Sequence, residues 1–204
     1  MTVAVPTAEL PQPGTNGIGW RGYLQVMSFT AVLVVDMLNA YRHPDADKLI
    51  PNVVPIIDPL KGLLARAHAS DDVDVVYIND NYGDFTADHR DIVAAALDGR
   101  RPDLVEPIVP PRDCRMLTKV RHSAFYSTAL GYLLGRLETK RVVITGQVTE
   151  QCILYTALDA YIRHFEVVIP PDGVAHIDAD LSSAALQMMN QNMAARLLPA
   201  AQCV

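Results

Sequence analysis

Short runs rich in valine and isoleucine alternate along this chain with segments of helical periodicity. Such runs are typical of buried strands, and strands separated by helices pair in parallel. The helices then cover both faces of the sheet. We therefore predict an α/β fold of three layers, α/β/α, built around a six-stranded parallel sheet. The predicted strands are residues 31–36, 73–80, 115–119, 141–146, 166–170 and 200–204.

Apolar residues at helical spacing mark the helices between these runs. One pattern runs from Ile56 to Ala67, and another begins at Leu181, where Met188 and Met189 are expected to fill the core. The segment 152–164 differs because it has apolar stripes on two sides. We expect it to be buried on both sides, and this favours a homodimer or a higher homo-oligomer.

Length and composition favour one domain. A chain of 204 residues, of which 50% are hydrophobic, can form a single core, and we place this domain at residues 23–204. Residues 1–22 show little periodicity and are expected to form an N-terminal arm. Their sequence has no pattern of a signal peptide or a membrane span, so we expect a cytoplasmic protein with no membrane partner.

Charge and cysteine content restrict the function further. A formal net charge of -6 and a pI near 5.4 oppose the attraction to phosphate on which nucleic-acid binding depends. Three cysteines without a C-x-x-C spacing argue against a disulfide framework and a structural zinc site. A nucleic-acid partner is therefore not expected, and each thiol needs its own interpretation.

Three reactive side chains stand at or just after the ends of predicted strands. Asp36 ends the first strand, Lys119 ends the third, and Cys152 follows the fourth after the turn GQVTEQ. In open parallel sheets, ligands bind beyond the carboxyl ends of the strands. An acid, an amine and a thiol could therefore converge there. The alternatives are a salt-bridge or turn-capping role for Asp36 and a structural role for a buried Cys152.

The surroundings of Cys152 suggest an activated thiol. Gly146 permits a tight turn, Thr149 is suited to cap a helix, and Cys152 would then lie in the first turn of that helix. A helix N-terminus favours a thiolate, and its free amide hydrogens could hold an oxyanion. Cys114 and Cys203 lack such surroundings and are expected to be structural.

Three segments resemble the isochorismatase-like cysteine hydrolases, the superfamily of nicotinamidase, N-carbamoylsarcosine amidase and isochorismatase. They are VLVVDMLN at 32–39, LTKVRHSAFYST at 117–128 and VVITGQVTEQCILYTALDA at 142–160. The resemblance implies a sheet of strand order 3-2-1-4-5-6. It places the nucleophile at Cys152, the carboxylate at Asp36 and the lysine at Lys119. It also implies a cis peptide between Gln147 and Val148, and an oxyanion hole formed by the amide hydrogens of Val148 and Cys152.

The sequence departs from the nicotinamidases at their Asp-x-His metal motif. The corresponding stretch is NDNYG, in which Tyr82 stands where the histidine is expected after Asp80. The six histidines form no close-spaced ligand pair, so we expect neither a metal nor another cofactor. His89 and His176 could approach the cleft, although solvated loop positions are the simpler interpretation.

Retention of the cysteine favours acyl chemistry on a small-molecule substrate, namely hydrolysis of an amide, a lactam or a ureide through a thioester. The sequence GQVTEQC and the following LDAYIRHF resemble the subgroup of streptothricin hydrolase, which opens a lactam. The alternatives are an isochorismatase-type vinyl-ether hydrolase and a catalytically silent scaffold. Asp80 and Glu150 would make the mouth acidic and suit a cationic substrate. The predicted substrate-binding residues are Leu38, Tyr41, Asn79, Asp80, Phe125, Tyr126 and Gln151.

Overall fold

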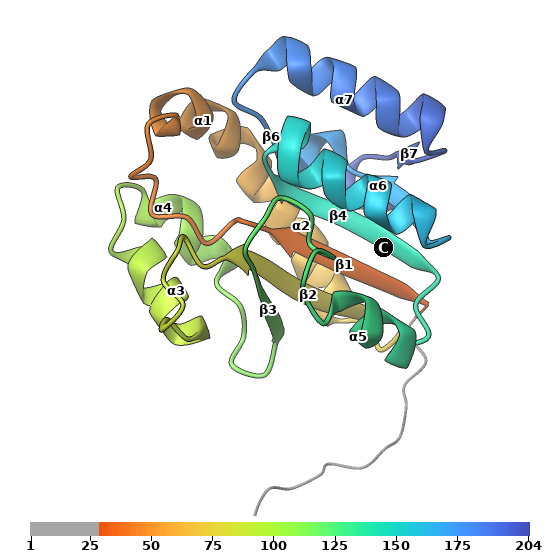
Figure 1. Ribbon diagram of the computed structural model, residues 1–204, viewed down its shortest axis with the longest axis horizontal. Coiled ribbons are helices and arrows are strands. Elements are labelled where there is room, and N and C mark those ends of the chain that lie inside the picture. The colour runs from red at the N-terminus through yellow and green to blue at the C-terminus, as the bar shows by residue number, and fades with distance from the viewer. Residues whose placement is uncertain (1–28) are drawn as a thin grey trace, which may run out of the picture.

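A parallel sheet with helices on both faces forms the framework of the protein (Figure 1). The computed structural model describes residues 29–204, so the predicted arm at 1–22 lies outside the described residues. The strands are β1 Thr30–Val35, β2 Val73–Asp80, β3 Arg115–Lys119, β4 Arg141–Gln147, β5 Glu166–Ile169, β6 Val174–Ala175 and β7 Arg196–Leu197. The α-helices are α1 Ala46–Val53, α2 Ile57–His68, α3 His89–Leu97, α4 Pro102–Val105, α5 Leu130–Arg136, α6 Leu154–Ile162 and α7 Ala179–Asn192.

The strand order confirms the predicted topology. Across the sheet of the described residues the order is β3-β2-β1-β4-β5-β7, and every pair is parallel. The short strand β6 pairs with the end of β4 and brings the sheet to seven strands rather than the predicted six. The first five predicted strands match the observed ones to within one residue at each end.

The last predicted strand, residues 200–204, is wrong. The sheet ends instead at β7, and Ala200–Gln202 form a 3-10 helix. The final ladder hydrogen bond joins the Leu198 amide to the Ile169 carbonyl at 3.3 Å. The next donor in a parallel ladder would be the Ala200 amide, which instead donates to the Asp172 Oδ1 at 2.8 Å.

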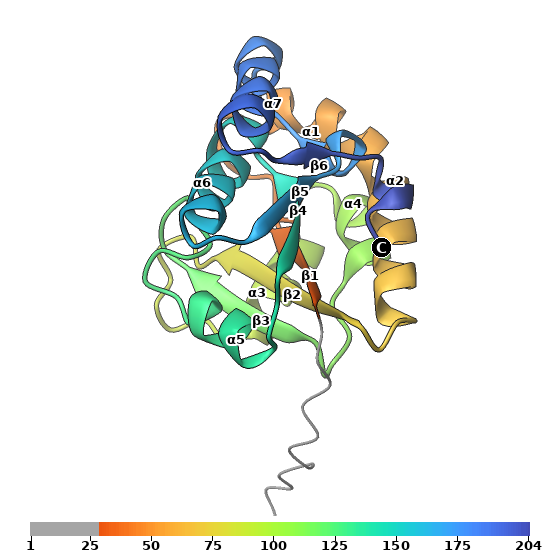
Figure 2. The same cartoon turned by 90° about the vertical axis from the view of Figure 1, so that its right-hand side faces the viewer.

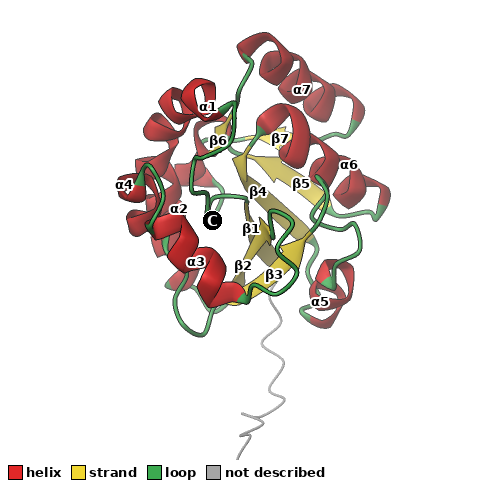
Figure 3. Ribbon diagram, turned by 60° about the vertical axis from the view of Figure 1, so that its left-hand side comes forward, coloured by secondary structure: helices red, strands yellow, loops and turns green. Residues whose placement is uncertain are grey.

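Side chains of the central strand alternate between two separate cores. Val32 and Val34 pack with helices α1 to α4, whereas Leu33 and Val35 pack with α5 to α7. Figures 2 and 3 show these two helical layers on opposite faces of the sheet. Because β1 is buried on both faces from Ala31 to Val35, its sequence there is continuously apolar rather than alternating. The three-layer prediction is therefore confirmed.

The outer helices depart from the predicted burial. Met189 is buried in the core, but Met188 is 46% exposed, because α7 covers the sheet with one face only. On α6 the stripe that includes Ala157 and Ala160 is buried, whereas Leu158 and Ile162 on the other side are exposed. The expected burial of this helix on two sides is therefore not met within one chain. Among residues 29–204, no helix is long and apolar enough to cross a membrane.

Gly146 provides a direct test of the packing between β4 and β1. Its φ is +111°, and a Cβ there would lie 2.1 Å from the Val35 carbonyl oxygen. We expect Gly146→Ala to lower the free energy of unfolding by roughly 2–4 kcal/mol in urea titrations. Gly83→Ala is the control, because Gly83 also has a positive φ but no atom within 4 Å of its Cβ position. Equal losses for both variants would contradict a steric role for Gly146.

Candidate active site

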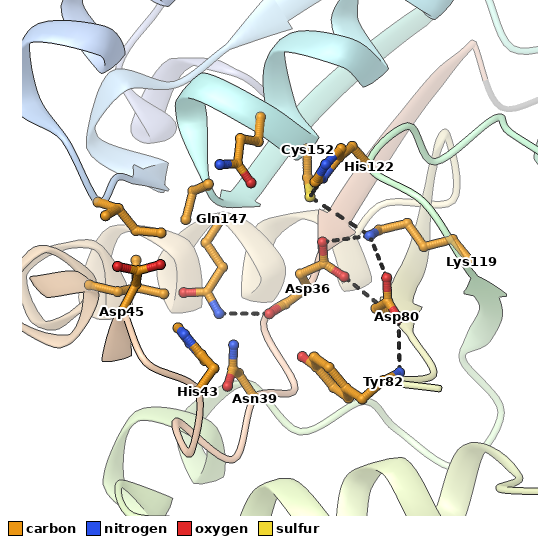
Figure 4. A pocket seen from close by; sticks show the side chains of 14 residues that line it. Asp36, Asn39, His43, Asp45, Asp80, Tyr82, Lys119, His122, Gln147 and Cys152 are labelled. Carbon is orange, nitrogen blue, oxygen red and sulfur yellow. Dashed lines mark hydrogen bonds and ion pairs between the residues drawn. The ribbon is translucent and has the colours of Figure 1, made fainter. Parts of the chain in front are cut away.

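The side chains of Asp36, Lys119 and Cys152 meet at the carboxyl end of the sheet (Figure 4). The Lys119 Nζ lies 2.8 Å from the Asp36 Oδ2 and 3.7 Å from the Cys152 Sγ. Asp36 follows β1, Lys119 ends β3, and Cys152 follows β4. The three residues that the sequence singled out are therefore brought together in one place.

Asp36 is held by contacts from the strands on both sides of β1. Its φ is +55°, a left-handed conformation that non-glycine residues seldom adopt. Its amide donates to the Ile78 carbonyl at 2.9 Å, and its Oδ1 accepts the Asp80 amide at 2.9 Å. The Gln147 Nε2 donates to the Asp36 carbonyl at 2.7 Å. Contacts from β2 and β4 thus fix the turn that aims this carboxylate at Lys119.

Lys119 is only 1% exposed, so its ammonium group depends on negative partners. Asp36 is the nearer, and the Asp80 Oδ2 lies 3.6 Å from the Nζ. Burial alone would lower the pKa of Lys119, but the charge of Asp36 and its hydrogen bond to the amine, with smaller contributions from Cys152 and Asp80, outweigh burial and raise that pKa. The amine therefore stays charged, in the gap between the carboxylate and the sulfur.

The local structure at Cys152 differs from the prediction. Thr149–Ile153 form a π-helical turn before α6, and Val148 rather than Thr149 occupies the cap position. The Thr149 hydroxyl instead donates to the Ala175 carbonyl at 3.0 Å, which ties this turn to β6. The Gln147–Val148 peptide is cis, where the resemblance places it. Helical turns of this π type recur at functional sites.

The thiol of the resting site is harder to ionise than the sequence suggested. Burial and the charge of Asp36 raise the pKa of Cys152, while Lys119 and the Val148 backbone act in the opposite direction. Burial also raises the pKa of Asp36, and Lys119 partly offsets that rise. A carboxylate with a raised pKa is a better proton acceptor, so the arrangement suits transfer of the thiol proton to Asp36 during attack.

A cavity of about 340 Å³ opens above these groups. Asp36, Lys119, Cys152 and the predicted residues Asp80, Gln151 and Val148 all line it. The other predicted wall residues do not. Leu38 and Tyr41 are in the core, Asn79 is buried and bonds both backbone groups of Leu38, Phe125 packs in the second core, and Tyr126 points to solvent.

The remaining lining residues were missed. They are Asn39, His43, Asp45, Leu49, Tyr82, His122, Gln147 and Ile177. His122 could have been found, because it follows Lys119 by three residues beyond the same strand end. Its Nδ1 lies 3.7 Å from the Cys152 Sγ. His43 and Asp45 belong to the loop after β1, whose path no periodicity reveals.

The acidic residues at the cavity differ from the predicted pair, Asp80 and Glu150. Glu150 does not line the cavity, because its Oε1 accepts the Ile177 and Asp178 amides at 2.8 and 2.9 Å. Asp45 stands at the cavity instead. His89 begins α3 and His176 follows β6, and neither of these two histidines lines the cavity.

The residues present do not fit a metal site of the Asp-x-His type. Tyr82 stands at the histidine position, and its hydroxyl donates to the Leu38 carbonyl at 3.3 Å. The Asp80 carboxylate accepts the Tyr82 amide at 2.8 Å and faces Lys119. Within residues 29–204, no group of three or more His, Cys, Asp or Glu residues could hold a metal ion.

Fold and site together define a hydrolase of the isochorismatase-like class. Residues 30–202 match the family model described as the Isochorismatase domain, and the chain belongs to this family. An uncharacterized isochorismatase family protein of Bacillus subtilis, YaaI, is 33% identical, over 85% of this chain and 96% of that protein.

Other relatives are named for the reaction that they catalyse. A maleamate amidohydrolase of Pseudomonas putida is 27% identical over 76% of each chain. A streptothricin hydrolase of Streptomyces noursei is 28% identical over 76% of this chain, but the match spans only 51% of that protein. An isochorismatase-like hydrolase of known structure from Alkaliphilus metalliredigens superposes with a TM-score of 0.70 at 25% identity, covering 86% of this chain and 96% of that chain.

The buried ion pair leads to a stability prediction. Lys119→Met removes the ammonium group and leaves the Asp36 carboxyl buried without its partner, so we expect about 3–5 kcal/mol less stability near neutral pH. The double variant Asp36→Asn/Lys119→Met should lose less, because neither member of the pair remains charged. Lys48→Met is the control: Lys48 is exposed, pairs with Asp45 at 3.5 Å and should contribute under about 1 kcal/mol. Urea unfolding in which Lys119→Met matches the wild type would refute this account.

Proposed function

We propose that this protein is a cysteine-dependent hydrolase that cleaves a C–N bond of a small-molecule amide, lactam or ureide through a thioester. The observation that carries the proposal is the contact of one buried ammonium group with both a carboxylate and a thiol, 2.8 Å from the Asp36 Oδ2 and 3.7 Å from the Cys152 Sγ. The amidohydrolase name of the Pseudomonas putida relative supports C–N chemistry.

Acylation begins with transfer of the Cys152 thiol proton to Asp36, whose raised pKa suits it to accept. Lys119 stabilises the thiolate as it forms. The sulfur attacks the carbonyl carbon, and the amide hydrogens of Val148 and Cys152 hold the resulting oxyanion. Protonated Asp36 then donates to the leaving nitrogen, the C–N bond breaks, and the thioester remains on Cys152.

The charges around the cavity favour a substrate that bears an amine or many N–H donors. Asp36, Asp45 and Asp80 all line it, whereas Lys119 already pairs with two of these carboxylates. A carboxylate substrate would meet an environment of its own sign. We therefore place cationic and amine-bearing amides ahead of anionic compounds such as isochorismate.

The proposal includes a homo-oligomer in the cytoplasm with no nucleic-acid partner. Leu158 and Ile162 on α6 are 43% and 57% exposed, and a second copy of the chain could cover them. Light scattering of the purified protein would show a monomer if this part of the proposal is wrong.

An activity screen with Cys152→Ala tests the chemistry. Wild-type protein should hydrolyse at least one compound from a panel of amides, ureides and lactams, and Cys152→Ala should lose about 10³-fold or more of that activity, since the nucleophile is gone. Cys114→Ala, which alters a half-buried thiol outside the site, is the control. Vinyl-ether hydrolysis that survives in Cys152→Ala would favour the isochorismatase-type reaction. Inactivity of the wild type on every compound would favour a silent scaffold.

The pH profile of acylation follows from the raised pKa of Asp36. Asp36 must be ionised to accept the thiol proton, so kcat/KM should fall as the pH decreases through that pKa. Because burial raises the pKa, the midpoint of this acid limb should lie above the value of an ordinary aspartate, about 3.9. Initial rates at low substrate concentration across the acid range give the midpoint. An acid limb at or below the ordinary value would exclude Asp36 as the base.

A further inference from the structure

A second nitrogen base contacts the sulfur of Cys152. The His122 Nδ1 lies 3.7 Å from the Sγ, the same distance as the Lys119 Nζ. Figure 4 shows this imidazole beside the thiol. His122 differs from Asp36 in exposure, because Asp36 is buried whereas His122 is open to solvent while it lines the cavity. The thiol therefore lies between a buried carboxylate and a solvent-accessible imidazole.

The loop that contains His122 is fastened to the helix that follows Cys152. The Ser123 hydroxyl donates to the Asp159 carboxylate, and the Ala124 amide donates to the Thr156 hydroxyl at 3.0 Å. Both acceptors belong to α6. The imidazole itself packs on Tyr155 of the same helix, with ring centroids 5.5 Å apart. These contacts with α6 fix the position of His122 relative to the nucleophile, although the side chain is exposed.

The second half of the reaction needs a base that water can reach. Once the amine has left, Asp36 is ionised again, but its Oδ2 is paired with Lys119 and its Oδ1 accepts the Asp80 amide. Imidazole is the side chain most often used to move protons near neutral pH. An exposed imidazole next to the thioester sulfur can activate water from the cavity without breaking the buried ion pair.

We propose that His122 is the general base of thioester hydrolysis, a proposal that rests on the cysteine mechanism above. Neutral His122 takes a proton from a water molecule, and the hydroxide oxygen bonds to the thioester carbonyl carbon. The tetrahedral intermediate then collapses, the C–S bond breaks, and the acid product is released. The departing sulfur takes the proton from the imidazolium, which regenerates the thiol of Cys152 and neutral His122.

Burst kinetics with p-nitrophenyl acetate test this assignment. Nitrophenolate leaves without a donated proton, so the burst reports acylation of Cys152 and the steady state reports hydrolysis of the acetyl thioester. His122→Gln should keep a burst within about twofold of wild type but turn over at least about tenfold more slowly. Intact-protein mass spectrometry should show the acetyl group accumulating on Cys152, and added imidazole should restore part of the turnover.

The controls distinguish a failure of the His122 assignment from a failure of the cysteine mechanism on which it rests. His68→Gln, an exposed histidine at the end of α2, should behave like wild type, and thermal melts should show that both variants are folded. Turnover of His122→Gln at the wild-type rate would overturn the assignment, and so would an equal loss of burst and turnover, which indicates a role in acylation. Two outcomes would instead overturn the thioester route itself, and the role of His122 with it. Either the wild type is not acetylated, or the acetylation persists in Cys152→Ala.

Discussion

The buried ion pair between Asp36 and Lys119 is the interaction on which the rest of the site depends. Placing both charges in the interior is costly, and only their close pairing and further hydrogen bonds offset that cost. The pair joins the ends of β1 and β3, which are not neighbours in the sheet, and β2 between them supplies the Asp80 amide and carboxylate. The carboxyl edge of three strands is therefore fixed by electrostatics as well as by backbone pairing.

Much of the framework could be predicted from the sequence, because buried parallel strands require long apolar runs and reactive polar residues then stand out at their ends. Asp36, Lys119 and Cys152 were found in this way. The wall of the cavity could not be. The chain turns with positive φ at Asp36 and again at Tyr41, which sends Leu38 and Tyr41 into the core and brings His43 and Asp45 to the cavity. Such turns depend on tertiary contacts that periodicity does not record.

The thiol illustrates why position along a helix does not determine reactivity. A helix start and a nearby ammonium group both favour the thiolate, yet burial and the adjacent carboxylate outweigh them and raise the pKa of Cys152. A thiol that stays protonated at rest is protected from unselective oxidation and alkylation. Its proton becomes available only through Asp36, so the nucleophile and the base act as one coupled unit.

Helix α6 links the two halves of the proposed chemistry. Its preceding turn holds Cys152, and its side chains Tyr155, Thr156 and Asp159 hold the loop that presents His122. The sheet therefore positions the buried ion pair beside the Cys152 sulfur, and this helix positions the imidazole beside it. Acylation needs a base in contact with the thiol and the leaving nitrogen, whereas thioester hydrolysis needs a base that takes a proton from water. A buried carboxylate and an exposed imidazole, both beside one sulfur, are suited to these two different tasks.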